Sequence, residues 1–300
     1  MTIPILIRCT KNDRYVDELI SKIQNGIPNA IVFAVPDFTG LSAGEAIQEA
    51  KKFSVPTLPI TKEFLSEFGL GYYGKRTGWR CGDYVLYRAL SIDWERAWVI
   101  EPDVAFLNGA ERIFAAFENS SADLVCRMFR KAKEGWWWRK GMQALKPDLP
   151  IFGMEFGMFR VSRELATEAF KLRRELHELH TEGIQVPNDE AIVATTAGNG
   201  HFYTEELTSL NPDSWNYWHV ARRAPIDDLI QEIGTEQIVH SAKHHDDFLE
   251  YLVDLWKHMP TKPVARRHAE LALSLASDHT KIQFLDKLIS MRSEESDQTR

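Results

Sequence analysis

The stretch Ala97-Trp-Val-Ile-Glu-Pro-Asp103 is the part of this sequence that decides the fold. Its first four residues are apolar and predict a short buried strand, which Glu101-Pro-Asp103 ends with two carboxylates. Because side chains alternate along a strand, we expect Glu101 and Asp103 to point to one side of its carboxyl end. Ligands bind at that end of open parallel sheets. The two carboxylates are therefore candidate ligands for Mg²⁺ or Mn²⁺ carrying a diphosphate; a solvated acidic turn is the alternative.

Strand-like and helix-like patterns alternate on the N-terminal side of this stretch. Apolar runs predict strands at 3–8, 29–36 and 55–60. The segments between and after them predict helices at 15–24, 43–52, from 61, and at 83–90. This alternation predicts an α/β fold, in which helices cover the faces of a mainly parallel sheet.

The second half of the chain is less regular. Strands are predicted at 123–126 and 156–161, and helices at 162–180, from 188, at 246–258 and at 265–291. We expect one α/β body over residues 1–245, a helical C-terminal extension over 246–292, and a flexible polar tail over 293–300.

Composition excludes several classes of protein. The 300 residues are 44% hydrophobic and 26% charged, as in ordinary globular chains, and the net charge of −7 disfavours nucleic acid as a bulk partner. Three cysteines, Cys9, Cys81 and Cys126, form no CxxC pair, which argues against a disulfide framework or a Cys-rich zinc site. No apolar run is long enough to cross a bilayer and no signal peptide is evident, so we expect a soluble, cytoplasmic protein without a membrane span.

A second candidate segment is Ile238-Val-His240-Ser-Ala-Lys243. His240 follows a short apolar run and could complete a metal site, and Lys243 could meet a phosphate as a point charge. The alternative is a surface or hydrogen-bonded histidine, and the neighbours His244 and His245 offer competing ligands.

The order of short motifs along the chain resembles GT-A type glycosyltransferases. The motifs are Gly82-Asp-Tyr84, Val99-Ile-Glu101-Pro-Asp103-Val104, Phe159-Arg-Val-Ser162, Asn188-Asp-Glu190 and His240-Ser-Ala-Lys243. The resemblance spans roughly residues 3–245. It implies a Rossmann-type, mainly parallel sheet flanked by helices, with a nucleotide-sugar-binding half (1–125) and an acceptor-binding half (126–245).

The resemblance also implies a metal-dependent transfer of a hexose or related sugar from a nucleotide-diphosphate donor, first of all a UDP-sugar. Mn²⁺ or Mg²⁺ would be held by Asp103, Glu101 and His240. The acidic motif is Glu-Pro-Asp where the family has Asp-x-Asp, so Asp103 is the surer ligand and Glu101 would contact ribose or a metal-bound water. The implied donor-binding residues are Arg8, Thr10, Asp37, Arg80, Asp83, Glu101 and Lys243.

The implied catalytic base is Glu190, with Asp189 close behind, because inverting members of the family need a carboxylate that accepts the proton of the acceptor. Capping of a helix by Asn188 and Asp189 is the alternative reading of these residues. The tryptophans 136–138 predict either a loop that stacks on a sugar or base, or a loop packed over the core. Arg222 and Arg223 could reach the diphosphate or only solvate their loop.

Two other functions stay open on sequence alone. The same carboxylates suit a metal-dependent nucleotidyltransferase or phosphohydrolase, and a degenerate scaffold of this kind could serve as a non-catalytic interaction protein. The acceptor is equally open: a glycan, a protein, a small molecule or a modified nucleobase. The C-terminal helices could form a homodimer interface or pack on the parent domain.

Overall fold

The computed structural model describes residues 3–74, 77–218, 224–258, 266, 269–270, 272–274 and 276–298, without the side chains of residues 232 and 291–298. The chain divides into two compact units, which are described one at a time. The first comprises Met1–Pro102 and Glu111–Asn211, and the second Asp103–Ala110 and Pro212–Arg300. The predicted boundaries at 125, 245 and 292 stay predictions.

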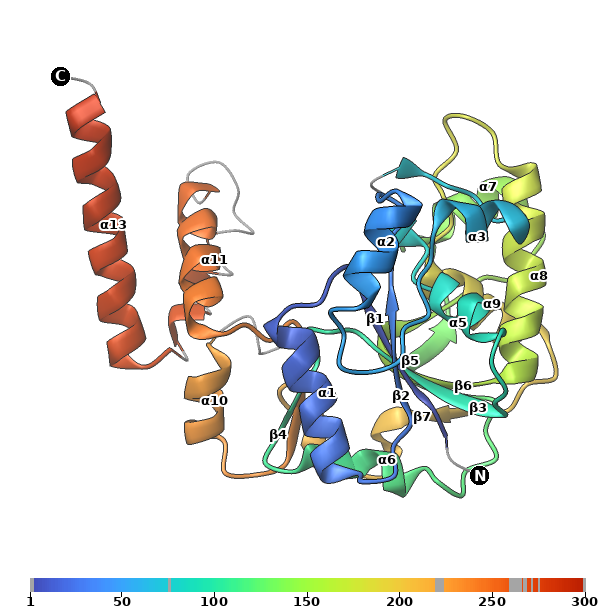
Figure 1. Cartoon of the computed structure of the whole chain (residues 1–300), viewed down its shortest axis with the longest axis horizontal. Coiled ribbons are helices and arrows are strands. Elements are labelled where there is room, and N and C mark those ends of the chain that lie inside the picture. Colours follow the sequence, from blue (N-terminus) through green and yellow to red (C-terminus); the bar gives the residue numbers. More distant parts are fainter. Residues whose placement is uncertain are drawn as a thin grey trace. The chain divides into compact units, whose positions relative to one another are not determined.

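The first unit is built on a six-stranded sheet in the order β2-β1-β3-β6-β5-β7 (Figure 1). Its strands are β1 (Ile5–Cys9), β2 (Val32–Pro36), β3 (Arg96–Ile100), β5 (Leu124–Lys131), β6 (Phe152–Ser162) and β7 (Thr204–Glu206). β6 runs antiparallel to both of its neighbours, and the other pairs are parallel. The predicted α/β class with a mainly parallel sheet is therefore confirmed. The segment predicted as a strand at 55–60 forms only isolated parallel bridges to Ala34 and Asp37.

Helices cover both faces of this sheet, with α1 and α6 on one side and α5, α8 and α9 on the other (Figure 1). The α-helices are α1 (Arg14–Gly26), α2 (Ala43–Ala50), α3 (Lys62–Glu67), α4 (Thr77–Arg80), α5 (Tyr84–Ala89), α6 (Ile113–Ala116), α7 (Arg139–Leu145), α8 (Arg163–Leu179) and α9 (Asp189–Asn199). Their N-termini lie where the sequence signals them: Asp13, Ser162 and Asn188 each accept hydrogen bonds from the first turn of the helix that follows.

The central strand β3 explains why its apolar run is continuous. Ala97 and Val99 belong to the core that α5, α8 and α9 close, whereas the ring of Trp98 packs 5.1 Å from that of Phe114 on the other face. A strand covered on both sides needs apolar residues at every position. Because β3 is buried on both faces, its first polar side chain toward the carboxyl end is that of Glu101, directly after the strand.

The second unit contains a two-stranded antiparallel sheet of β4 (Ala105–Leu107) and β8 (Gln237–Val239). Among the helices whose bounds the structure describes, those of this unit are α10 (Ile226–Glu232), α11 (His245–His258) and α13 (Asp278–Gln298). The 3₁₀ helices with described bounds are η2 (Ala110–Arg112), η3 (Leu207–Ser209) and η4 (Pro212–Trp215). Phe248 and Leu252 of α11 pack with Phe284 of α13. The helical backbone of α13 enters the stretch 293–300 that we expect to be a flexible tail, and that flexibility stays a prediction. Across the residues described above, every helix is too short or too polar to cross a membrane.

Candidate active site

Three of the sequence-predicted residues meet where β1 and β3 end. The two strands pair in parallel with Ile7 opposite Ile100, so the next residues, Arg8 and Glu101, face each other. Nη1 of Arg8 lies 2.5 Å from Oε1 of Glu101 and 3.4 Å from Oδ2 of Asp189, the first residue of α9. The other guanidinium nitrogen of Arg8 donates to the carbonyl oxygen of Gly78. The site is thus an arginine between two carboxylates at the carboxyl edge of the sheet.

Gly82 brings the backbone into van der Waals contact with this cluster. Its N–H donates to Oδ2 of Asp189 at 3.0 Å. A Cβ atom at position 82 would lie 2.3 Å from that oxygen and 2.4 Å from Nη1 of Arg8. Because real Cβ atoms do not approach so closely, only glycine permits this arrangement.

Two adjacent carboxylic acids at the start of α9 have strongly perturbed acidity. Burial, together with the charges of Asp83 and Glu101, raises the pKa of Asp189 to about 7 against the opposing effect of Arg8. Burial, and then the charge of Asp189, raises the pKa of Glu190 to about 8. Burial alone would lower the pKa of Arg8, but the neighbouring carboxylates outweigh it and the pKa is raised. An acid that titrates near neutral pH suits proton transfer.

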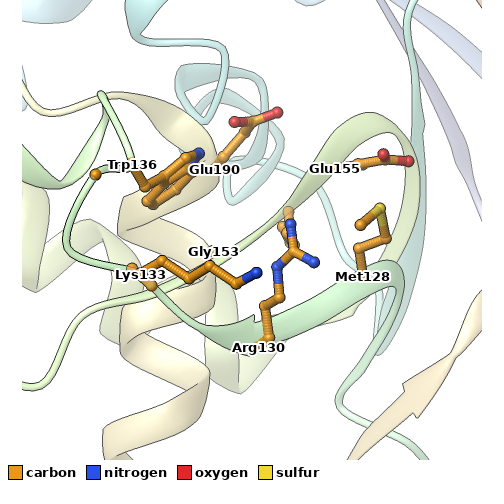
Figure 2. Close-up of a pocket in the computed structure, with 10 residues that line it drawn as sticks. Met128, Arg130, Lys133, Trp136, Gly153, Glu155 and Glu190 are labelled. Atoms are coloured by element: carbon orange, nitrogen blue, oxygen red, sulfur yellow. The ribbon is translucent and has the colours of Figure 1, made fainter.

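Of these two acids, Glu190 lines a cavity of the first unit, whereas the oxygens of Asp189 are engaged by other groups. Asp189 is held by Arg8, by the N–H of Gly82 and by the N–H of Glu190, which donates to its Oδ1 at 2.9 Å. Glu190 lines a cavity of about 500 Å³ in the first unit, shown in Figure 2. The other lining residues are Met128, Arg130, Ala132, Lys133, Gly135, Trp136, Gly153, Met154 and Glu155.

A β-bulge in β5 shapes one wall of this cavity. The pairing of β5 with β6 shifts register on both sides of Arg127, and Met128 has a positive φ of 58°. The N–H of Met128 leaves the β5–β6 ladder and donates to a carboxylate oxygen of Glu206 at 2.9 Å. Bulges re-aim side chains, and here Met128 and Arg130 both line the cavity. Sequence reasoning missed these residues because it ends the strand at 126.

Asp83 and Arg80 hold the segment that leads into α9. Asp83 is completely buried and pairs with Arg173, whose Nε and Nη2 lie 2.7 and 2.5 Å from its two oxygens. Arg173 also donates to the carbonyl of Pro187 at 2.6 Å, and Arg80 donates to that of Val186 at 3.2 Å. These contacts fix the backbone just before Asp189, and the donor contacts predicted for Asp83 and Arg80 stay predictions. Arg173 was missed because nothing in a helical sequence marks which arginine turns inward.

The remaining predicted residues of the first unit lie near the strand ends. Asp37 follows β2 and accepts hydrogen bonds from the N–H and hydroxyl of Thr39, at 2.9 and 2.6 Å. Its other oxygen lies against Gly78, the residue whose carbonyl binds Arg8. Thr10 is exposed. Their roles in donor binding stay predictions.

The three adjacent tryptophans have different surroundings. Trp136 lines the cavity, and Trp137 is 53% exposed with Nζ of Lys140 lying 4.6 Å from its ring centroid. The ring of Trp138 lies 5.1 Å from that of Trp79, edge to face. The loop therefore both borders a cavity and packs on the protein, so neither of the two expectations describes all three rings.

In the second unit, Asp103 and His240 lie side by side. Nε2 of His240 is 3.6 Å from Oδ1 of Asp103, and its ring stacks on Trp218 with centroids 4.9 Å apart. Two backbone bonds fix the pair: His240 donates to Trp218, and Ala242 donates to Asp103, at 3.0 and 2.9 Å. A carboxylate oxygen and an imidazole nitrogen at this separation fit two adjacent ligand positions of a divalent cation.

Lys243, the predicted phosphate contact, lies with Nζ 5.9 Å from the ring centroid of Tyr251. Glu101 belongs to the first unit and precedes Asp103 by two residues in the chain. Arg222 and Arg223 lie outside the described residues.

Comparisons with known proteins give a likeness in structure alone, because no family model and no curated protein matches the chain. The galactosyltransferase LgtC, solved with donor and acceptor sugar analogs, is 11% identical at a TM-score of 0.45, over 90% of this chain and 95% of that one. Glucosyl-3-phosphoglycerate synthase from Mycobacterium tuberculosis is 16% identical with a TM-score of 0.34, over 56% of this chain and 57% of that one. The inositol-1-phosphate CTP transferase from T. maritima is 10% identical with a TM-score of 0.35, over 69% of this chain and 85% of that one.

Glycosyltransferases are therefore among the solved structures that this chain is similar to.

Proposed function

We propose that this chain is a metal-dependent glycosyltransferase that moves a hexosyl or related group from a nucleotide diphosphate to an acceptor. The observation that carries the proposal is Glu190: a carboxylic acid with a pKa raised to about 8 lines an open cavity beside the Arg8–Asp189 pair. A base is most effective when its pKa lies near the working pH.

Glu190 is the proposed base, and Asp189 is its positioning neighbour. Glu190 would accept the proton of the acceptor hydroxyl as that oxygen attacks the anomeric carbon. The oxygens of Asp189 are already engaged by Arg8 and two N–H groups, which leaves it poorly placed to receive a proton from substrate. Its charge raises the pKa of Glu190 and so strengthens the base.

Asp103, His240 and Glu101 are the proposed ligands of Mn²⁺ or Mg²⁺. The stacked and hydrogen-bonded ring of His240 supports this assignment, since a metal-binding imidazole needs a fixed orientation. When bound, the cation would neutralise the charge that develops on the departing nucleoside diphosphate. The ion pair between Arg8 and Glu101 favours Asp103 as the direct carboxylate ligand.

A UDP-sugar is the proposed donor, bound by Arg8, Thr10, Asp37, Arg80, Asp83, Glu101 and Lys243. Support comes from Arg8 and Asp37, which both lie against Gly78 at the ends of neighbouring strands. Cytoplasmic location and homodimer formation remain predictions.

The test is product analysis after incubation with Mn²⁺ and a panel of nucleotide sugars. We expect release of nucleoside diphosphate by the wild type and its loss in Asp103→Asn, while Asp213→Asn, an exposed aspartate of the same unit, keeps activity. Release of pyrophosphate or free phosphate would instead identify a nucleotidyltransferase or phosphohydrolase. Absence of both turnover and nucleotide binding by calorimetry would leave the interaction protein as the explanation.

A further inference from the structure

Two cationic side chains line the cavity beside Glu190. Arg130 and Lys133 both line it, and their side chains extend toward the same part of the cavity in Figure 2. Among the residues that the structure describes, neither side chain forms an ion pair. Both are exposed, so their ammonium and guanidinium groups are accessible from solvent.

The acidic groups of the same cavity do not cancel this charge. Glu155 lies 2.7 Å from Nη1 of Arg127, so its negative charge is already paired. Burial, and then the charge of Asp189, raises the pKa of Glu190 to about 8, so this carboxyl carries less negative charge at neutral pH than an ordinary glutamate. Arg130 and Lys133 therefore give the cavity a net positive charge, which attracts an anion.

The same cavity has a flat aromatic wall. Trp136 lies directly over Gly153, where an added Cβ would come within 2.7 Å of the indole. Figure 2 shows the indole, Arg130 and Lys133 around one cavity. Aromatic faces pack on the C–H surface of sugars, and about 500 Å³ is within the range of small-molecule sites.

From these observations we propose that the acceptor is a small sugar bearing a phosphate or carboxylate group, which Arg130 and Lys133 bind while the sugar packs on Trp136. This inference rests on the proposed function, since the hydroxyl to be glycosylated would then lie toward Glu190. Arg130 contributes a planar fork for two oxygens of the anion, and Lys133 contributes a point charge.

Direct binding tests the proposal without requiring any transfer. Isothermal calorimetry without donor or metal would compare glucose 6-phosphate, glucuronate, glucose and inorganic phosphate. We expect at least one of the two anionic sugars to bind about tenfold or more tightly than glucose, and inorganic phosphate to compete with it. The arm with the higher affinity distinguishes phosphate from carboxylate as the recognised group.

Three single variants locate the effect. Arg130→Gln and Lys133→Gln should each weaken binding of the preferred anionic sugar about tenfold and leave glucose binding unchanged. Lys131→Gln is the matched control, because Lys131 lies between the two, is exposed and does not line the cavity. Circular dichroism would establish that each variant is folded.

Equal affinities for charged and neutral sugars, no binding of any probe at millimolar concentration, or an equal loss in Lys131→Gln would overturn the proposal. The last result would mean that only diffuse surface charge acts. Transfer to a neutral acceptor with no preference for anions would reject this inference and leave the glycosyltransferase assignment intact. Binding of anionic sugars without any sugar transfer would keep the anion-binding cavity and reject the glycosyltransferase assignment.

Discussion

Replacing Glu190 by glutamine should make the protein more stable at alkaline pH while it abolishes transfer. The pKa of Glu190 is raised from 4.5 to about 8, so the folded state binds this proton more tightly than the unfolded state. The stabilisation that the neutral acid provides is complete below pH 4.5 and is lost as the pH rises through 8. Glutamine has nearly the same shape as glutamic acid and does not ionise. The stability of the variant therefore does not fall with the titration of this group.

The magnitude follows from the size of the pKa change. A rise from 4.5 to about 8 corresponds to at most about 5 kcal/mol of stability lost across this pH range. Because Glu190 borders the cavity and keeps some contact with solvent, we expect about 2 to 3 kcal/mol. Asp189 is present in both proteins, and burial is the main cause of its raised pKa of about 7, so that part of its contribution cancels in the difference.

Urea unfolding from pH 5 to pH 9 measures this difference. The free energies of unfolding of wild type and Glu190→Gln should agree at pH 5 and separate by about 2 to 3 kcal/mol at pH 9. Glu182→Gln, at an exposed glutamate, should follow the wild type throughout. Transfer activity of Glu190→Gln should fall by about 10²- to 10⁴-fold. A stability difference that does not change with pH, or one of opposite sign, would refute the reasoning.

Three further substitutions test other parts of the structure. Arg173→Met should cost about 3 to 5 kcal/mol in urea unfolding, because it leaves the buried charge of Asp83 unpaired, and adding Asp83→Asn should recover much of that loss. Gly82→Ala should cost about 1 to 3 kcal/mol, since its methyl group would collide with Asp189, and no loss would contradict the close approach. Trp218→Ala should weaken Mn²⁺ binding about tenfold in a paramagnetic-resonance titration, because the ring of His240 loses its stacking partner; unchanged affinity would remove His240 from the metal site.

The first unit shows which features can be predicted from local sequence. β3 and its carboxylate end follow from a short apolar run, and α8 and α9 begin where Ser162 and Asn188 cap them. These features depend on neighbouring residues alone, so the pattern contains them. The meeting of Arg8 with Glu101 could be anticipated too, because parallel strands bring their carboxyl ends to one edge.

The contacts that define the cavity could not be predicted in this way. β5 continues through the polar stretch Arg127–Lys131, and its bulge depends on the pairing with β6 and on a hydrogen bond to Glu206. Asp83 and Arg173 are 90 residues apart, and each resembles a surface charge in its own segment. The bulge in β5 and the Asp83–Arg173 pair both depend on contacts between residues far apart in the sequence, which a local sequence pattern does not contain.

The stacking of Trp136 on Gly153 has a consequence for selectivity. With hydrogen as the side chain at 153, the indole of Trp136 packs directly against the backbone of β6. Alanine or serine at position 153 would push the ring of Trp136 into the cavity. The cavity would then accept only smaller ligands. Substitution at position 153 would therefore change the size of the ligand that the cavity accepts, without altering any of its charged residues.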